Sequence, residues 1–132
     1  MKYLLDTNIC IYIIKRRPPS VLNRFRTCQL GDIGISTITV AELTHGTQKS
    51  QQPQKNQAAL DQFLLPLEIV DFDFAAAQTY GTIRADLEKK GIPIGPLDFL
   101  IAAQALSLGV SLITNNEKEF LRVPGLTVEN WV

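Results

Sequence analysis

Short apolar runs alternate with longer segments of helical periodicity along the whole chain. Five of these runs predict buried strands, at residues 3–5, 33–35, 67–70, 110–113 and 126–128. Strands this short and this apolar are typical of a parallel sheet that is covered on both faces.

The segments between these runs predict helices. Their expected ranges are 8–15, 20–25, 37–46, 58–65, 74–90, 97–108 and 117–120. We expect Ser20 to cap the second helix and Asp73 to cap the fifth, while Gly91 stands where a glycine commonly follows a helix end. Residues 49–56 are polar and contain Pro53, so they predict a loop or a helix entrance.

Strands that alternate with helices in this way predict an α/β fold. We expect three α/β/α layers around a central, mostly parallel sheet. A chain of 132 residues has the size of one ordinary domain. Neither half alone offers a complete core, so residues 1–132 are expected to form a single domain.

Composition narrows the class of protein without naming it. The chain is 45% hydrophobic and 20% charged, as ordinary globular proteins are. No apolar run is long enough to span a bilayer, and Cys10 and Cys28 are expected to be small buried residues rather than a disulfide. These features predict a reduced, cytoplasmic protein with no membrane partner.

The formal net charge of zero counts mildly against nucleic-acid binding, because such proteins usually carry excess positive charge. Local clusters matter more than the total. The sequence has one cluster at Lys15, Arg16 and Arg17 and another at Lys89 and Lys90. Each single residue in them is more typical of a solvated helix end than of a specific RNA contact.

Carboxylates and amides follow the predicted strands at their carboxyl ends, where α/β proteins place their working residues. The side chains expected at this edge are Asp6, Asn8, Glu42, Asp98, Thr114, Asn116 and Glu119. Each alone has a structural explanation, such as a helix cap or a solvated position. Several carboxylates at one edge would repel each other unless a divalent cation held them, and hard oxygen ligands favour Mg²⁺ or Mn²⁺ over zinc.

A site of this kind predicts metal-assisted hydrolysis of a phosphodiester. His45 is the only histidine, and no nucleophile stands beside it in the sequence. Ser36, Thr37 and Thr39 lack the glycine elbow of a hydrolase nucleophile. Covalent catalysis through these residues is therefore disfavoured.

Four segments, in order, resemble the motifs of PIN-domain ribonucleases. They are LDTNI at 5–9, ITVAELTHG at 38–46, GPLDFLIAAQA at 95–105 and LITNNEKEF at 112–120. The closing VPGL and ENW segments resemble the end of VapC toxins of type II VapBC toxin–antitoxin systems. The likeness runs from Tyr3 to Trp131.

This resemblance implies a magnesium-dependent endoribonuclease, a hydrolase that cleaves structured RNA such as tRNA. It also implies a cognate VapB-like antitoxin and a homodimer. The segments 11–14 and 21–25 are candidates for the antitoxin surface and equally for the core or the dimer contact.

The resemblance also implies roles for individual residues. Asp6, Glu42 and Asp98 map onto the acidic triad of the family, with Asp6 and Asp98 as metal ligands. Many relatives have an aspartate where this chain has Asn116, so either Asn116 or Glu119 takes the fourth acidic position. Asn8, Thr114 and Asn116 are expected to support the metal ligands.

Two other functions fit part of the pattern. In a haloacid-dehalogenase-like phosphotransfer enzyme Asp6 would be the nucleophile, but a second aspartate is needed where this chain has Asn8. A degenerate PIN domain would act only as a binding module, and the amide at Asn116 is the one feature in its favour.

Overall fold

The computed structural model describes residues 1–132, and its centre is one parallel sheet of five strands in the order β3-β2-β1-β4-β5. The strands are β1 (Tyr3–Leu5), β2 (Ile33–Ser36), β3 (Glu68–Val70), β4 (Ser111–Ile113) and β5 (Val128–Glu129). All four strand pairs are parallel. The predicted α/β fold with a central parallel sheet is confirmed.

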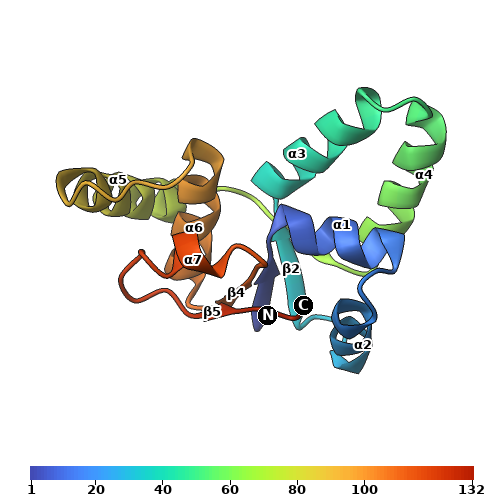
Figure 1. The fold of residues 1–132 in the computed structure, drawn as a ribbon, viewed down its shortest axis with the longest axis horizontal. Helices are drawn as coiled ribbons and strands as arrows, with labels where there is room; N and C mark the ends of the chain where they lie inside the picture. Colours follow the sequence, from blue (N-terminus) through green and yellow to red (C-terminus); the bar gives the residue numbers. More distant parts are fainter.

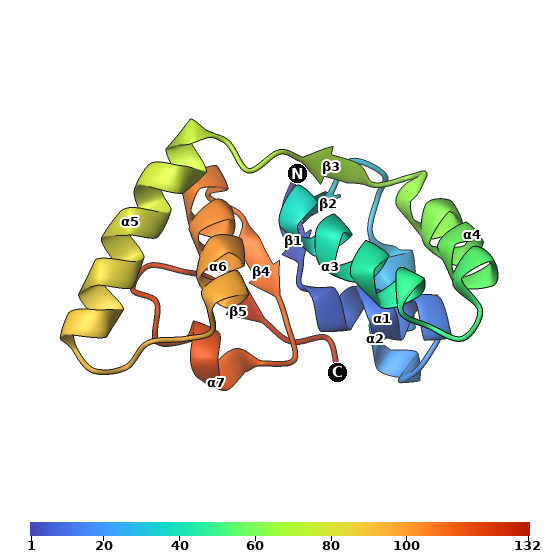
Figure 2. The same cartoon turned by 90° about the horizontal axis from the view of Figure 1, so that it is seen from above.

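Seven helices connect the strands and cover both faces of the sheet (Figures 1 and 2). They are α1 (Thr7–Lys15), α2 (Pro19–Thr27), α3 (Thr37–Gln48), α4 (Pro53–Leu64), α5 (Phe74–Lys89), α6 (Pro96–Leu108) and α7 (Glu117–Phe120). In Figure 2, α5 and α6 lie on one side of the sheet and α1 to α4 on the other. No helix combines the length and the apolar character that crossing a bilayer requires.

Alternating side chains of the central strands divide the core into two parts. Leu4 and Leu112 face the part built with α5 and α6, whereas Leu5 and Ile113 face the part built with α1 to α4. Successive side chains of a strand point to opposite faces, so a strand buried on both sides needs apolar residues at every position. This requirement explains the uninterrupted apolar runs in the sequence.

The chain order reverses at β1, which has β2 on one side and β4 on the other. In open α/β sheets a crevice forms beyond the carboxyl ends of the strands at such a point. Asp6 directly follows β1 and Thr114 directly follows β4. The fold therefore brings these two side chains to the same place.

Three helices begin with a side-chain cap. Asp6 accepts a hydrogen bond from the Thr7 amide, Ser36 accepts one from Ile38, and Asp73 accepts one from Ala76. The predicted cap at Asp73 is thus confirmed. Gly91 has a φ of 74°, the left-handed conformation expected of a glycine after a helix end.

Some sequence-based expectations are wrong in detail. The helix expected at 58–65 already begins at Pro53, so the segment 49–56 contains a helix entrance, one of its two predicted alternatives; a proline in the first turn of a helix lacks only an amide that would be unpaired there. Helix α2 begins at Pro19 with no side-chain cap, so Ser20 has no capping role. The last strand is shifted to Val128–Glu129. Both cysteines are free, but only Cys10 is buried.

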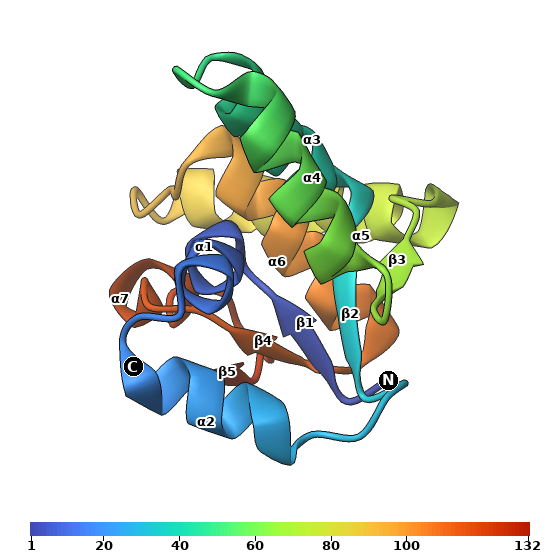
Figure 3. The ribbon, with the colours of Figure 1, turned by 90° about the vertical axis from the view of Figure 1, so that its right-hand side faces the viewer.

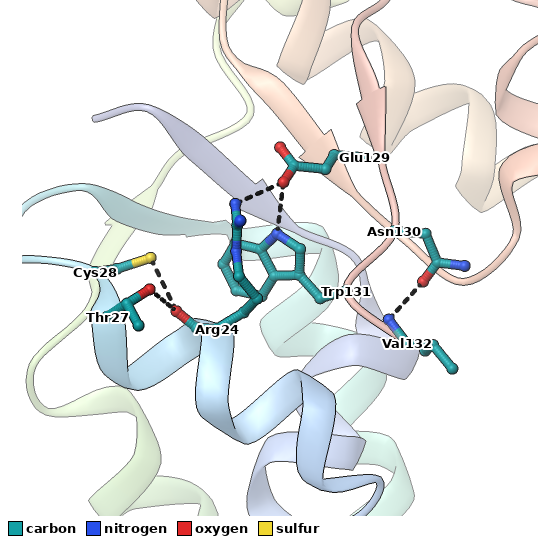
Figure 4. A network of polar contacts seen from close by, with 7 residues as sticks. All are labelled: Arg24, Thr27, Cys28, Glu129, Asn130, Trp131 and Val132. Carbon is teal, nitrogen blue, oxygen red and sulfur yellow. Dashed lines mark hydrogen bonds and ion pairs between the residues drawn. The ribbon is translucent and has the colours of Figure 1, made fainter.

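The end of the chain is clamped onto α2 and the first strand (Figure 4). Trp131 is 3% exposed, and its ring meets the ring of Tyr3 edge to face at 5.4 Å between centroids. Arg24 lies over the Trp131 ring and is ion-paired with Glu129 at 2.6 Å. The Trp131 indole donates a hydrogen bond to the same carboxylate at 3.1 Å. The last residues therefore complete the core instead of trailing from it.

Candidate active site

Asp6 is 6% exposed and lies between the end of β1 and the start of α1. One carboxylate oxygen accepts a hydrogen bond from the Thr7 amide at 2.8 Å. The other accepts one from the Thr114 hydroxyl, also at 2.8 Å. A buried carboxylate needs such partners, and these two hold it in one orientation.

Glu42 comes to the same edge from the second turn of α3. The Thr7 hydroxyl donates a hydrogen bond to its Oε1 at 2.9 Å. Thr7 thus contacts two carboxylates, through its amide to Asp6 and through its hydroxyl to Glu42. Sequence analysis gave Thr7 no role in the site, although its place directly after Asp6 was a usable signal.

Asp98 lies in the first turn of α6, where the helix dipole favours a negative charge. A Cβ atom added at Gly95 would come within 3.2 Å of its Oδ2, which is tighter than ordinary contact. The absence of a side chain at Gly95 therefore leaves room for the Asp98 carboxylate. The sequence-based placement of Asp98 at the start of this helix is correct.

Glu119, on the short helix α7, is held by the amide of Asn116. The Asn116 side chain donates a hydrogen bond to Glu119 Oε2 at 3.0 Å, and its backbone amide donates one to the Thr114 hydroxyl at 2.9 Å. Asn116 therefore acts on the neighbouring carboxylate and on the threonine that binds Asp6. Of the two candidates for the fourth acidic position, Glu119 is the one that brings a charge.

The four carboxylates affect one another: the pKa values of Asp6 and Asp98 each depend on the charges of others in the group. Burial raises the pKa of Asp6, hydrogen bonds from Thr114 and Thr7 lower it, and the charges of Glu42 and Glu119 raise it further. Asp98 is affected more strongly. Burial, a hydrogen bond with Glu119 and the charge of Asp6 are the largest causes that raise its pKa to about 7.

A small hard cation would relieve this repulsion. No three His, Cys, Asp or Glu side chains converge closely enough to be joint ligands of one ion. Mg²⁺ does not require that, because it commonly keeps several waters and uses only one or two protein carboxylates. Asp6 and Asp98 are the two carboxyl groups whose pKa is raised, and a cation beside either one would favour its charged form.

Asn8 adds a further polar group next to Asp6. Its side-chain oxygen is buried and has no hydrogen-bond partner in the protein. A buried unpaired oxygen of this kind calls for a donor, and an ordered water near the carboxylates would supply one. His45 is exposed and makes no side-chain hydrogen bond, so it has no place in the site.

Comparison with known proteins identifies the family of this chain. A model of the PIN domain family matches residues 3–126. The chain belongs to the PIN-domain family. The predicted resemblance is confirmed over nearly the whole length of the chain.

Curated relatives match this PIN domain from end to end. The tRNA(fMet)-specific endonuclease VapC of Shigella flexneri is 47% identical over 131 residues, which cover 99% of this chain and 98% of that protein. Ribonuclease VapC2 of Rickettsia felis is 46% identical over 132 residues, with 99% and 98% covered. This PIN domain is therefore of the VapC ribonuclease type.

Solved structures show the same fold. VapBC2 from Rickettsia felis, bound to a DNA fragment from its promoter, superposes with a TM-score of 0.92 at 45% identity and covers 100% of both chains. The DNA-bound VapBC of Salmonella typhimurium gives a TM-score of 0.94 at 43% identity and covers 100% of this chain and 99% of that one. The sheet and its helices are thus those of VapC proteins.

Proposed function

We propose that this PIN domain, as one domain over residues 1–132, is the endoribonuclease toxin of a toxin–antitoxin pair. It cleaves structured RNA such as tRNA by metal-assisted hydrolysis. The observation that carries the proposal is the group of four carboxylates at the carboxyl edge of the sheet. They come from four distant parts of the chain, and burial, together with the charges of neighbouring carboxylates, raises the pKa of Asp6 and of Asp98.

PIN-domain ribonucleases generally need a divalent metal ion. In this chain Asp6 and Asp98 would hold Mg²⁺, with Mn²⁺ as an alternative. When bound, the ion would polarise the phosphodiester, lower the pKa of water and neutralise charge on the leaving oxygen. The hydrogen bonds from Thr7 and Thr114 orient Asp6 for this task.

Glu42 would orient the attacking water or take a proton from it. It is only half-buried, and Thr7 occupies just one of its carboxylate oxygens. A base held by a hydrogen bond acts from a defined position, which general-base catalysis requires. Glu119 would add negative charge beside Asp98, while Thr114 binds Asp6 and Asn116 binds Glu119. Asn8, whose side-chain oxygen has no partner in the protein, would support the metal ligands only through water.

The substrate class follows from the relatives and from the shape of RNA. The Shigella flexneri relative is named as a tRNA(fMet)-specific endonuclease. Sequence-specific proteins read RNA mostly in single-stranded loops, whose bases are unstacked. We therefore infer that this chain cuts a loop of a folded RNA.

A VapB-like antitoxin is the expected inhibitor, because the solved relatives are VapBC complexes. A groove of about 350 Å³ lies between α1, α3 and α4 beside the site. Glu42 and Thr7 line one part of it, and apolar residues including Ile11 and Ile14 line another. An apolar segment of the antitoxin bound there would cover Glu42. We expect a homodimer as well, as the family resemblance implies.

Membership of the PIN family removes the haloacid-dehalogenase alternative, in which Asp6 would be the nucleophile. A binding module without catalysis is the remaining alternative. The two functions differ in one observable, the cleavage of RNA by a metal-loaded protein.

The test is to incubate antitoxin-free protein with total tRNA and rRNA in Mg²⁺ or Mn²⁺ and to map new 5′ ends. Discrete cuts should appear, and EDTA, Asp6→Ala and Asp98→Ala should each abolish them. Asp61→Ala is the matched control, because Asp61 is an exposed carboxylate on α4 that accepts a hydrogen bond from Gln57 on the same helix. A folded wild type that binds Mn²⁺ but makes no cuts would support the binding module instead.

A further inference from the structure

Next to the carboxylates, a second set of polar side chains is left unused by the proposed chemistry. It consists of Tyr12 on α1, Asn115 between β4 and α7, and Asn130 after β5, and we call it the amide–phenol cluster. Asn115 donates a hydrogen bond to the Tyr12 hydroxyl at 3.1 Å, and its own carbonyl accepts one from Asn130 at 3.2 Å. In Figure 3, α1 follows β1 and α7 follows β4 along the chain, so the loop that carries Asn115 comes between β4 and α7.

This cluster is continuous with the active site. Asn115 stands between Thr114, which binds Asp6, and Asn116, which binds Glu119. Tyr12 is one turn of α1 beyond Asn8, and residues four apart lie on the same helix face. A strand of RNA with its scissile phosphate at Asp6 and Asp98 would therefore have a neighbouring nucleotide at the cluster.

Stability does not explain the cluster. Asn115 is exposed, and Tyr12 and Asn130 are only half-buried. Hydrogen bonds between such groups replace hydrogen bonds to water and contribute little net free energy. The bonds fix the orientation of an exposed amide, Asn115, and of the hydroxyl of a half-buried tyrosine, as a surface that reads a ligand requires.

The charges beside the cluster indicate which part of a nucleotide fits. Asn130 also donates a hydrogen bond to the Glu117 carboxylate at 2.8 Å, and this negative charge disfavours a phosphate there. Amide and hydroxyl groups match the donors and acceptors of a base edge, and the ring of Tyr12 can stack on a base.

Basic side chains that could bind RNA phosphates follow Tyr12, about one turn further along, at the end of α1. The ion pairs of the structure use Arg24, Arg84 and Lys90, so the basic turn formed by Lys15, Arg16 and Arg17 carries no carboxylate partner. Its backbone is held against the last turn of α1, because the amide of Arg17 donates a hydrogen bond to the Tyr12 carbonyl at 3.1 Å. An RNA strand that runs from the carboxylates along α1 would therefore pass Tyr12 and reach the basic turn, whose cations have no carboxylate partner.

We infer that the amide–phenol cluster reads one unstacked base of the RNA next to the cleaved bond, while the basic turn holds the phosphates that follow. This inference rests on the proposed function, since it assigns the nucleotide preference of the same site. It makes Tyr12, Asn115 and Asn130 residues that determine specificity.

The test uses a library of RNA stem-loops with randomised loop nucleotides, and the cut products are sequenced. Wild type, Tyr12→Phe and Asn115→Ala are compared with Tyr80→Phe, a control that removes the hydroxyl of another half-buried tyrosine, one that is hydrogen-bonded to Arg84 and not to the cluster. Both cluster variants should reduce the preference for one nucleotide at the same loop position by roughly five- to a hundredfold. Tyr80→Phe should keep the wild-type preference at every position.

A second measurement separates the basic turn from the cluster. Replacing Lys15, Arg16 and Arg17 by alanine should weaken cleavage of all loops alike and reduce the salt dependence, by roughly 0.7 in the log–log slope for each lost phosphate contact. Nucleotide preference should stay as in the wild type.

Several outcomes would overturn the inference. Cluster variants that keep the wild-type preference, or that slow the cleavage of every loop equally, would show that the cluster reads no base. An unchanged preference with weaker antitoxin binding would assign the cluster to a protein interface. A wild type that cuts no loop at all would instead remove the proposed function, and the inference with it.

Discussion

Asp98→Asn should make the metal-free protein more stable, although it removes a residue of the active site. In the folded protein the charged form of Asp98 is opposed first by burial and then by Glu119, Asp6 and Glu42. Its pKa is about 7 there, against about 3.9 in an unfolded chain. A shift of roughly three pKa units corresponds to about 4 kcal/mol as an upper bound. Asp98 is half-buried, so we reduce the expected gain to about 1–2 kcal/mol to allow for solvent screening.

The sign of the effect fixes its pH dependence. A carboxyl whose pKa is raised by folding binds its proton more tightly in the folded state, so stability falls as the pH rises through the window from about 4 to 7. Above pH 7 the full destabilisation is present, and roughly a third of it remains at pH 5. The gain from Asp98→Asn should therefore be largest at pH 8 and small near pH 4.

The assay is urea unfolding in EDTA at pH 5 and pH 8. Asp61→Asn is the control, because Asp61 is an exposed carboxylate that forms no ion pair. Saturating Mn²⁺ should then stabilise the wild type, by about 2.7 kcal/mol at a hundred times its Kd, and the variant much less. A loss of stability in Asp98→Asn at pH 8, or a gain that is equal at both pH values, would refute the electrostatic argument.

Three further substitutions test the contacts around the site and at the chain end. Thr7→Val should lower kcat roughly tenfold to a hundredfold with little change in KM, because Glu42 loses its hydrogen bond, and Thr7→Ser should restore the rate. Equal kcat values for Thr7→Val and wild type would mean that Glu42 needs no support. Thr114→Val should weaken Mn²⁺ binding about 10- to 100-fold in a calorimetric titration, and Thr114→Ser should not, since only the hydroxyl contacts Asp6. Trp131→Ala should lower the free energy of unfolding by about 3–5 kcal/mol in urea, as expected for a buried aromatic ring, and a loss below about 1 kcal/mol would contradict the clamp.

Much of the site could be predicted because it depends on local patterns. Asp6 directly follows an apolar run, and Asp98 follows Pro96 at a helix start, so their positions needed no knowledge of distant contacts. Parallel strands then bring such residues to one edge of the sheet.

Other features depend on contacts between distant residues and left no clear pattern in the sequence. The hydrogen bond from Thr7 to Glu42 joins positions 35 residues apart. Glu119 contributes to the raised pKa of Asp98, and the side chain of Asn116 holds the Glu119 carboxylate by a hydrogen bond. The helix that carries Glu119 has four residues, too few for a hydrophobic periodicity from which its orientation could be predicted. The last strand was misplaced because Leu126 is apolar but packs beside the sheet, while pairing with β4 begins at Val128.

The clamp at Trp131 has a consequence for local opening of the folded protein. The Trp131 indole and Arg24 share the Glu129 carboxylate, and Glu129 pairs with Ile113 in the sheet. The carbonyl of Glu129 also accepts a hydrogen bond from the amide of Thr114, whose hydroxyl donates one to Asp6. An opening that frees the Trp131 ring would therefore loosen the strand beside Thr114, and we expect it to disturb Asp6 before the rest of the sheet unfolds.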